Sequence, residues 1–230
     1  MELSIDTASD WASIALSDEG RLCGETTWRC ERQHSVQLLP AVESLLARLT
    51  VDKHDLRAVF VCTGPGGYAG LRVGVSAAKG LAFALGTSIA GVGRLEAEAY
   101  QFVDCDRPVC AVHRAGRGEV AWAVYQGPRR EWREIASPRL STPDGLLAEA
   151  PSDALFCAEE GDGVEEMLAA SGATMAVAPV RRRAGVLAEL GWRRLSAGDV
   201  DDVRTLAPLY LREPAIGPAK NAAPKEIGRE

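Results

Sequence analysis

Residues 62–74 read CTGPGGYAGLRVG, and glycine occupies five of these thirteen positions. The segment follows a β-branched run at 58–61 and leads into a long apolar stretch from Leu71 to Leu85. A glycine-rich turn between a strand and a helix can hold a phosphate group on its backbone amides, or it can let the helix pack closely on its strand. Either way, the pattern predicts a strand–loop–helix unit of an α/β protein.

Known nucleotide-binding motifs do not account for this loop. A P-loop requires Lys-Ser or Lys-Thr after the glycines, and neither is present. Residues 64–69 fit the pattern GxGxxA, but no acidic residue follows about 20 positions later to hold a ribose. Gly66 and Gly67 could equally supply positive φ angles for a turn after Pro65.

The composition is that of a globular protein with an acidic surface. Of the 230 residues, 47% are hydrophobic and 25% charged, and the net charge is −6. Because phosphate contacts need clustered Lys and Arg, we expect any link to RNA to run through a partner. The chain has no apolar run of about 18 residues, so no membrane span is expected. The six cysteines form no CxxC pair, and we expect free thiols in a cytoplasmic protein.

Strands and helices alternate over the first hundred residues in a βββαβα order that continues with one more strand and helix. The predicted strands are 2–7, 11–17, 21–28, 58–63 and 88–92, and the predicted helices are 35–49, 70–85 and 94–103. The polar segment 104–108, which ends in Pro108, breaks this pattern and indicates a domain boundary.

A second, weaker copy of the same order follows the boundary. We predict strands at 109–115, 119–126, 133–137, 154–159 and 207–211, and helices after Thr142, at 162–171 and at 182–196. The fold class is therefore α/β, with two βββαβα halves. We expect domains at 1–104 and 105–213, and a disordered tail at 214–230.

Two helices carry more apolar surface than contact with one sheet requires. Helix 35–49 has two adjoining apolar stripes, and helix 70–85 has small residues at every fourth position next to a larger apolar face. The helices could be buried between the sheet and each other, or they could form a partner surface, which is the interpretation we favour. The candidate partner-binding residues are Leu39, Val42, Leu46, Leu71, Gly74, Val75, Ala78 and Ala82.

No catalytic or metal-binding set emerges from the sequence. The histidines at 34, 54 and 113 have no partner at metal-ligand spacing, and there is no GxSxG motif. We therefore assign no catalytic and no metal residues. Asp6 and Thr7, in the first hairpin, are a second candidate phosphate site, although an Asx-type turn explains them equally well.

Five segments together resemble the TsaB (YeaZ) family: IDTASDWASIAL, HSVQLLPAVESLL, GPGGYAGLRVGVSAAKGLA, GRGEVAWAVY and PLYLRE. The resemblance covers roughly residues 2–212. It implies a two-domain actin-like, sugar-kinase-like (ASKHA) fold. Asp6, Thr7, Gly64, Gly66 and Gly67 would then be vestiges of the phosphate-binding loops of that fold.

The resemblance also implies a function. Members of this family are non-catalytic subunits that bind and activate a TsaD-type transferase, which forms N6-threonylcarbamoyladenosine at position 37 of tRNA with a TsaE-type ATPase. Two N-terminal helices dock on the transferase, or pair two copies as a homodimer. The tRNA would be met only through the complex, and the chain itself would hold no cofactor, with a nucleotide possible only at the interface between the subunits.

Two departures bear on this function. The related transferase carries a His-x-x-x-His metal motif, and Arg94 and Glu98 stand at those positions here. An arginine has no free lone pair to ligate a metal. In addition, Val112-His113-Arg114 replaces a segment that carries an acidic residue in relatives. The alternative is a stand-alone nucleotide-dependent phosphotransferase or metallopeptidase-like enzyme of the same fold.

Overall fold

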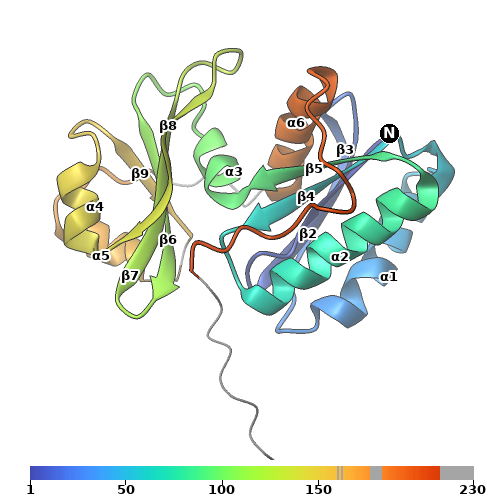
Figure 1. Cartoon of the computed structure of the whole chain (residues 1–230), viewed down its shortest axis with the longest axis horizontal. Coiled ribbons are helices and arrows are strands. Elements are labelled where there is room, and N and C mark those ends of the chain that lie inside the picture. The colour runs from blue at the N-terminus through green and yellow to red at the C-terminus, as the bar shows by residue number, and fades with distance from the viewer. Residues whose placement is uncertain (160, 162, 177–182, 213–230) are drawn as a thin grey trace, which may run out of the picture.

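Two twisted sheets, each flanked by helices, lie side by side in the computed structural model (Figure 1). The structure describes residues 1–159, 161, 163–176 and 183–212. Strands are β1 Glu2–Asp6, β2 Trp11–Asp18, β3 Arg21–Arg29, β4 Ala58–Gly64, β5 Ser88–Gly93, β6 Val109–Gly116, β7 Glu119–Gln126, β8 Arg133–Ser141 and β9 Leu155–Ala158. Helices are α1 His34–Arg48, α2 Tyr68–Leu85, α3 Arg94–Tyr100, α4 Pro143–Glu149, α5 Val164–Ala170 and α6 Arg183–Ser196, with a 3₁₀ turn at Lys53–Asp55.

The first sheet has the strand order β3-β2-β1-β4-β5, in which β1 pairs antiparallel with β2 and parallel with β4. Helices α1 and α2 cover one face of this sheet. Leu3 and Ile5 of β1 point to that face and join its apolar core. Helix α6 covers the opposite face, where Phe60 and Ala90 meet Trp192 (Figure 1). The first sheet is thus the middle layer of three.

The second sheet repeats the first with one strand fewer. Its order is β8-β7-β6-β9, with β6 antiparallel to β7 and parallel to β9. The position that β5 holds in the first sheet is occupied by a single parallel bridge between Phe156 and Met175. The predicted duplication is therefore present, since β6–β9 with α4 and α5 follow the βββαβα order.

Helix α3 and an apolar cluster join the two sheets. Tyr100 of α3 meets Trp132 edge-on with ring centroids 5.5 Å apart, and Trp132 stacks on Tyr125 of β7 at 5.8 Å. Leu187 and Leu190 of α6 belong to the same cluster. The two halves of the chain therefore share one continuous core.

The C-terminal part of the described chain differs from the sequence-based prediction. Helix α6 packs on the first sheet, so residues 183–212 do not belong with the second sheet as a boundary at 104/105 implied. Residues 207–211 form no strand. Instead the Leu209 amide donates to the Thr63 carbonyl at 2.8 Å, beside an irregularity in the pairing of β4 with β5 that frees this oxygen. The predicted tail at 214–230 lies outside the described residues.

None of the helices in the described part of the chain has the length and apolar character needed to cross a membrane.

Candidate functional site

The two candidate phosphate loops lie against each other at the carboxyl ends of β1 and β4. The Gly67 amide donates to the Ala8 carbonyl at 2.8 Å, and the Thr7 hydroxyl donates to the Gly70 carbonyl at 2.8 Å. The Asp6 carboxylate accepts from the Ala8 amide at 2.8 Å, so the Asx-type turn is present. The structure brings the predicted residues together, but the groups that would bind a phosphate bind each other.

The glycines of this region allow backbones to approach closely inside the chain. A Cβ atom on Gly66 would lie 2.3 Å from the Ala8 carbonyl oxygen, and one on Gly70 would lie 2.2 Å from that of Thr7. A Cβ atom on Gly74 would lie 2.1 Å from the Thr7 hydroxyl. The small residues at Gly70 and Gly74 therefore allow α2 to contact the first hairpin, while Ala78 and Ala82 pack in the core of the first sheet.

Seven of the eight predicted partner-binding residues are in the core, so their assignment to a partner surface is wrong. Each has at most 9% of its surface exposed because α1 and α2 direct these positions to the first sheet and to each other. The buried residues are Val42, Leu46, Leu71, Gly74, Val75, Ala78 and Ala82. Leu39 alone remains available, with 48% of its surface exposed.

Other apolar side chains do lie on the outward face of these two helices. Val36 is 70% exposed, Phe83 is 75% exposed and Tyr68 is 45% exposed. The apolar stripes did not predict these residues, because the stripes form the buried side of each helix. Val36 and Phe83 could have been recognised from the sequence, because each is a large apolar residue that lies outside the apolar stripe of its helix.

A cleft of about 660 Å³ lies between the two sheets, and Arg94 is buried in its wall. Arg94 begins α3 directly after β5. Its guanidinium group donates to Glu98 at 2.7 Å and also pairs with Glu159, which follows β9. Ligands of open α/β folds bind outside the carboxyl ends of the parallel strands, which is where these residues lie. An internal ion-pair cluster occupies this place.

Glu159 connects the two halves of the chain through that cluster. Its second carboxylate oxygen lies 2.5 Å from Arg183 of α6, which also donates to Ser9 at 2.5 Å. Burial alone would raise the pKa of Glu159, but Arg94 and Arg183 outweigh it and hold the pKa below its usual value. The carboxylate is therefore ionised at neutral pH and links α3, α6 and the end of β9.

His113 lies on β6 next to the same cluster. Its Nε2 atom is 3.3 Å from an Arg94 nitrogen. Burial, together with the charge of Arg94, lowers the pKa of His113 to about 3. The imidazole is neutral at physiological pH, which is compatible with a neighbouring arginine. This is the divergent Val112-His113-Arg114 segment, and the acidic residue expected from relatives is absent from it.

Comparisons with known proteins find relatives of two kinds, TsaB proteins and TsaD transferases. The model of the tRNA N6-adenosine threonylcarbamoyltransferase (TsaD) family matches residues 28–215. The tRNA threonylcarbamoyladenosine biosynthesis protein TsaB of Bacillus subtilis is 31% identical over 217 residues, covering 91% of this chain and 93% of that protein. A tRNA N6-adenosine threonylcarbamoyltransferase of Anaeromyxobacter dehalogenans is 36% identical over 110 residues, covering 41% of this chain and 33% of the transferase.

A solved structure is also similar to this chain. YeaZ from Pseudomonas aeruginosa superposes with a TM-score of 0.77 at 26% identity, covering 90% of this chain and 99% of that one. The predicted two-part actin-like, sugar-kinase-like (ASKHA) fold is confirmed. This chain belongs to the TsaB (YeaZ) family.

Proposed function

We propose that the chain is a non-catalytic subunit that binds and activates a TsaD-type transferase for N6-threonylcarbamoyladenosine formation at position 37 of tRNA. The relative from Bacillus subtilis carries the name of a biosynthesis protein for this nucleoside. The same chain is also similar to the transferase itself, as expected of two related subunits that pair through matching elements.

The observation that carries the proposal is the apolar character of the outward face of α1 and α2. Val36 and Leu39 lie in the first turns of α1, and Phe83 lies near the end of α2, where it is 75% exposed. The face is about 25 Å long, since α2 has 18 residues. Large exposed apolar side chains on two neighbouring helices are anchors that a partner can bury. We therefore assign the transferase to this face.

The ion pairs in the cleft support the proposal that the chain is non-catalytic. Arg94 and Glu98 form an ion pair at the two positions where the resemblance places the metal-binding histidines of the transferase. Glu159 and Arg183 add further charge pairs across the cleft. A chain built in this way contributes a surface to its complex, and the reacting groups come from the partner.

Co-purification tests the docking face. The double variant Leu39→Glu, Phe83→Glu places two charges on it without entering the core, and it should no longer co-purify with the organism's own transferase. The matched control is Ile135→Glu on β8, where the side chain is also exposed, at 42%. Normal recovery of the control with loss of the double variant supports the proposal. Equal recovery of both would place the partner elsewhere.

Three further parts of the proposal concern partners and nucleotide. We propose that a TsaE-type ATPase joins the complex, that the same helical face pairs two copies when the transferase is absent, and that the chain alone holds no cofactor. The rival assignment, an independent phosphotransferase or metallopeptidase-like enzyme, requires the free chain to bind Mg-ATP or a metal. Calorimetry of the free chain with Mg-ATP separates the two, because micromolar binding accompanied by turnover would favour the rival.

A further inference from the structure

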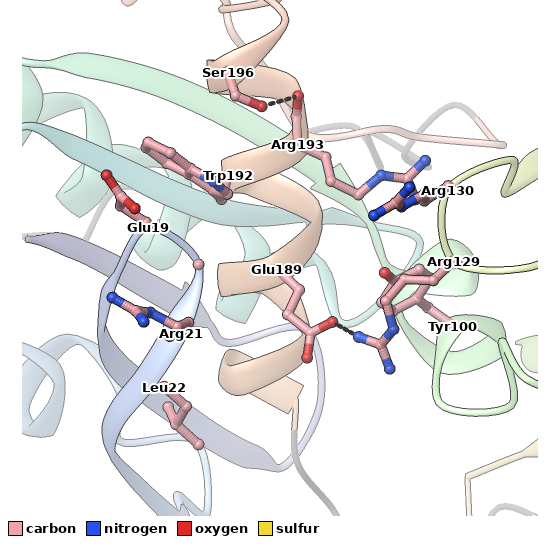
Figure 2. Close-up of a pocket in the computed structure, with 11 residues that line it drawn as sticks. Glu19, Arg21, Leu22, Tyr100, Arg129, Arg130, Glu189, Trp192, Arg193 and Ser196 are labelled. Carbon is pink, nitrogen blue, oxygen red and sulfur yellow. Dashed lines mark hydrogen bonds and ion pairs between the residues drawn. The ribbon is translucent and has the colours of Figure 1, made fainter.

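A solvent-exposed groove of about 600 Å³ crosses the outer surface of α6 (Figure 2). The β2–β3 turn forms one side of the groove, and the loop between β7 and β8 forms the other. Its charged lining consists of four arginines, Arg21, Arg129, Arg130 and Arg193, against two glutamates, Glu19 and Glu189. Carboxylates just outside the lining face two of these arginines, since Asp18 lies 3.9 Å from Arg21 and Asp104 lies 3.8 Å from Arg129.

Two of the arginines are held in place by one aromatic ring. Tyr100 is 3% exposed, and its ring centroid lies 5.5 Å from the Arg129 guanidinium and 5.9 Å from that of Arg193. Arg129 is further fixed by its ion pair with Glu189, drawn in Figure 2. Since part of the side-chain entropy is already lost, these groups are arranged before any ligand arrives.

Two arginines of the groove form no direct salt bridge among the described residues, Arg130 and Arg193. Arg129 pairs with Glu189, and the charge of Arg193 acts on the Glu96 carboxylate of α3, where it opposes the rise in pKa that burial causes. Arg130 is exposed, and Figure 2 shows its guanidinium group on the same side of α6 as that of Arg193. Guanidinium groups bind phosphate oxygens in a bidentate manner and are weakly hydrated, so a phosphate between them is well matched.

We propose that this groove binds the sugar-phosphate backbone of RNA when the chain is part of its complex. This inference rests on the proposed function, whose substrate is an RNA. The groove lies across the first sheet from α1 and α2, so a transferase docked on those helices leaves the arginines accessible (Figure 1). The acidic chain then contributes RNA contacts without binding RNA tightly by itself.

Recognition in this groove is of the backbone and not of the bases. Tyr100 is buried and Arg57 already lies over the Trp192 ring at 4.8 Å, which leaves little aromatic surface for stacking on a base. Contacts to phosphates fix the position of a nucleic acid but carry no sequence information. The groove therefore orients a tRNA that other parts of the complex select.

The experiment measures tRNA binding by the reconstituted complex between about 50 and about 200 mM salt. Arg130→Glu combined with Arg193→Gln should weaken binding at least about tenfold and reduce the salt slope by about 1 to 2. The control is Arg117→Glu, an exposed arginine at the other end of β7, which should change neither quantity. A double variant with the wild-type slope and affinity overturns the inference.

Two further readouts separate this inference from the proposed function. Loss of an assembled protein subunit in the double variant, with RNA affinity of the remaining complex unchanged, would assign the groove to an acidic protein segment and overturn the RNA assignment. The second readout is the binding of tRNA by the free chain at low salt. If the double variant weakens that binding while no transferase complex forms even with the wild-type chain, the groove is supported and the proposed function fails.

Discussion

His113 lies beside Arg94 in the cleft, and its environment makes the stability of the fold depend on pH. Burial and Arg94 lower the pKa of His113 to about 3, against about 6.5 for an unfolded chain. Between these values the unfolded state binds the proton and the folded state does not, so stability is lost as the pH falls.

The free energy of unfolding should therefore decrease by about 2 kcal/mol from pH 7 to pH 5 because of His113 alone. Urea denaturation at the two pH values measures this, and His113→Gln should remove most of the difference. Glu159 also makes stability depend on pH, but its folded pKa is lowered, so that stability is lost only below its unfolded pKa of about 4.3. An unchanged pH dependence in the variant would mean that His113 is protonated in the folded chain.

Arg94 should matter far more to stability than an arginine at the surface. Arg94→Met leaves Glu98 without its buried cation and Glu159 with Arg183 alone, and the loss of one partner of a buried pair costs about 3–5 kcal/mol. Arg129→Met is the comparison, since its ion pair with Glu189 is about half exposed and is expected to contribute at most about 1 kcal/mol. Urea denaturation of the two variants at pH 7 should separate them clearly. Equal losses would show that the cleft cluster does not stabilise the fold.

For single residues, the sequence predicted which side chains and glycines converge, but it did not predict which groups they bind. Asp6, Thr7 and the glycines at 64, 66 and 67 do converge, because the ends of adjacent parallel strands meet at one sheet edge. That Thr7 would bond to Gly70 could not be read from local pattern, since 63 residues separate the two. The same holds for Glu159, which meets Arg94 and Arg183 only in the folded chain.

At the scale of the element, the small-residue pattern of helix α2 is compatible with two different packing partners. Small residues at every fourth position allow another backbone to approach, but the period does not say whether that backbone belongs to the same chain. Here it is the first hairpin. The bounds of α2, Tyr68–Leu85, lie close to the predicted 70–85 because helical period and the Gly86 cap are local signals.

Two glycines of α2 should respond in opposite ways to the same substitution. Gly70→Ala places a Cβ atom 2.2 Å from the Thr7 carbonyl oxygen, so the hairpin must shift and the chain is destabilised. Gly80→Ala meets nothing within 4 Å and should stabilise by up to about 1 kcal/mol through helix propensity alone. Melting temperatures of the two variants measure the contrast. Stabilisation by Gly70→Ala would contradict the close approach of helix and hairpin.

The segment 207–211 shows where apolar content misleads. Its sequence APLYL resembles a short strand, but Leu209 and Tyr210 each keep 39% of their surface exposed. Tyr210 instead meets the Tyr68 ring at 5.3 Å. A strand requires a row of backbone hydrogen bonds to a neighbour, whereas residues 207–211 make one such bond in the described part of the chain, from the Leu209 amide to the Thr63 carbonyl.

For the whole molecule, the order of strands was predictable and the position of α6 was not. Strand order follows from the connections, whereas α6 returns to a sheet whose strands precede it by about a hundred residues or more. The fit there is close, since a Cβ atom on Gly191 would lie 2.2 Å from the Phe60 ring. The first sheet is therefore completed by the C-terminal part of the chain.

It follows that residues 1–104 should not fold alone. Without α6, the face of the first sheet that carries Phe60 and Ala90 is exposed to water. A 1–104 fragment should lack a cooperative thermal transition in circular dichroism, whereas a 1–212 fragment should unfold cooperatively. A cooperative transition of the shorter fragment would instead support the predicted domain boundary at residue 104.

Formation of N6-threonylcarbamoyladenosine in tRNA tests the central proposal most directly. Purified transferase and its ATPase partner should form the nucleoside when this chain is added, and Ile135→Glu should support formation as well as the wild type does. Leu39→Glu combined with Phe83→Glu should reduce formation to the level seen without the chain. Formation by the chain in the absence of the transferase, or full activity of the double variant, would contradict the account.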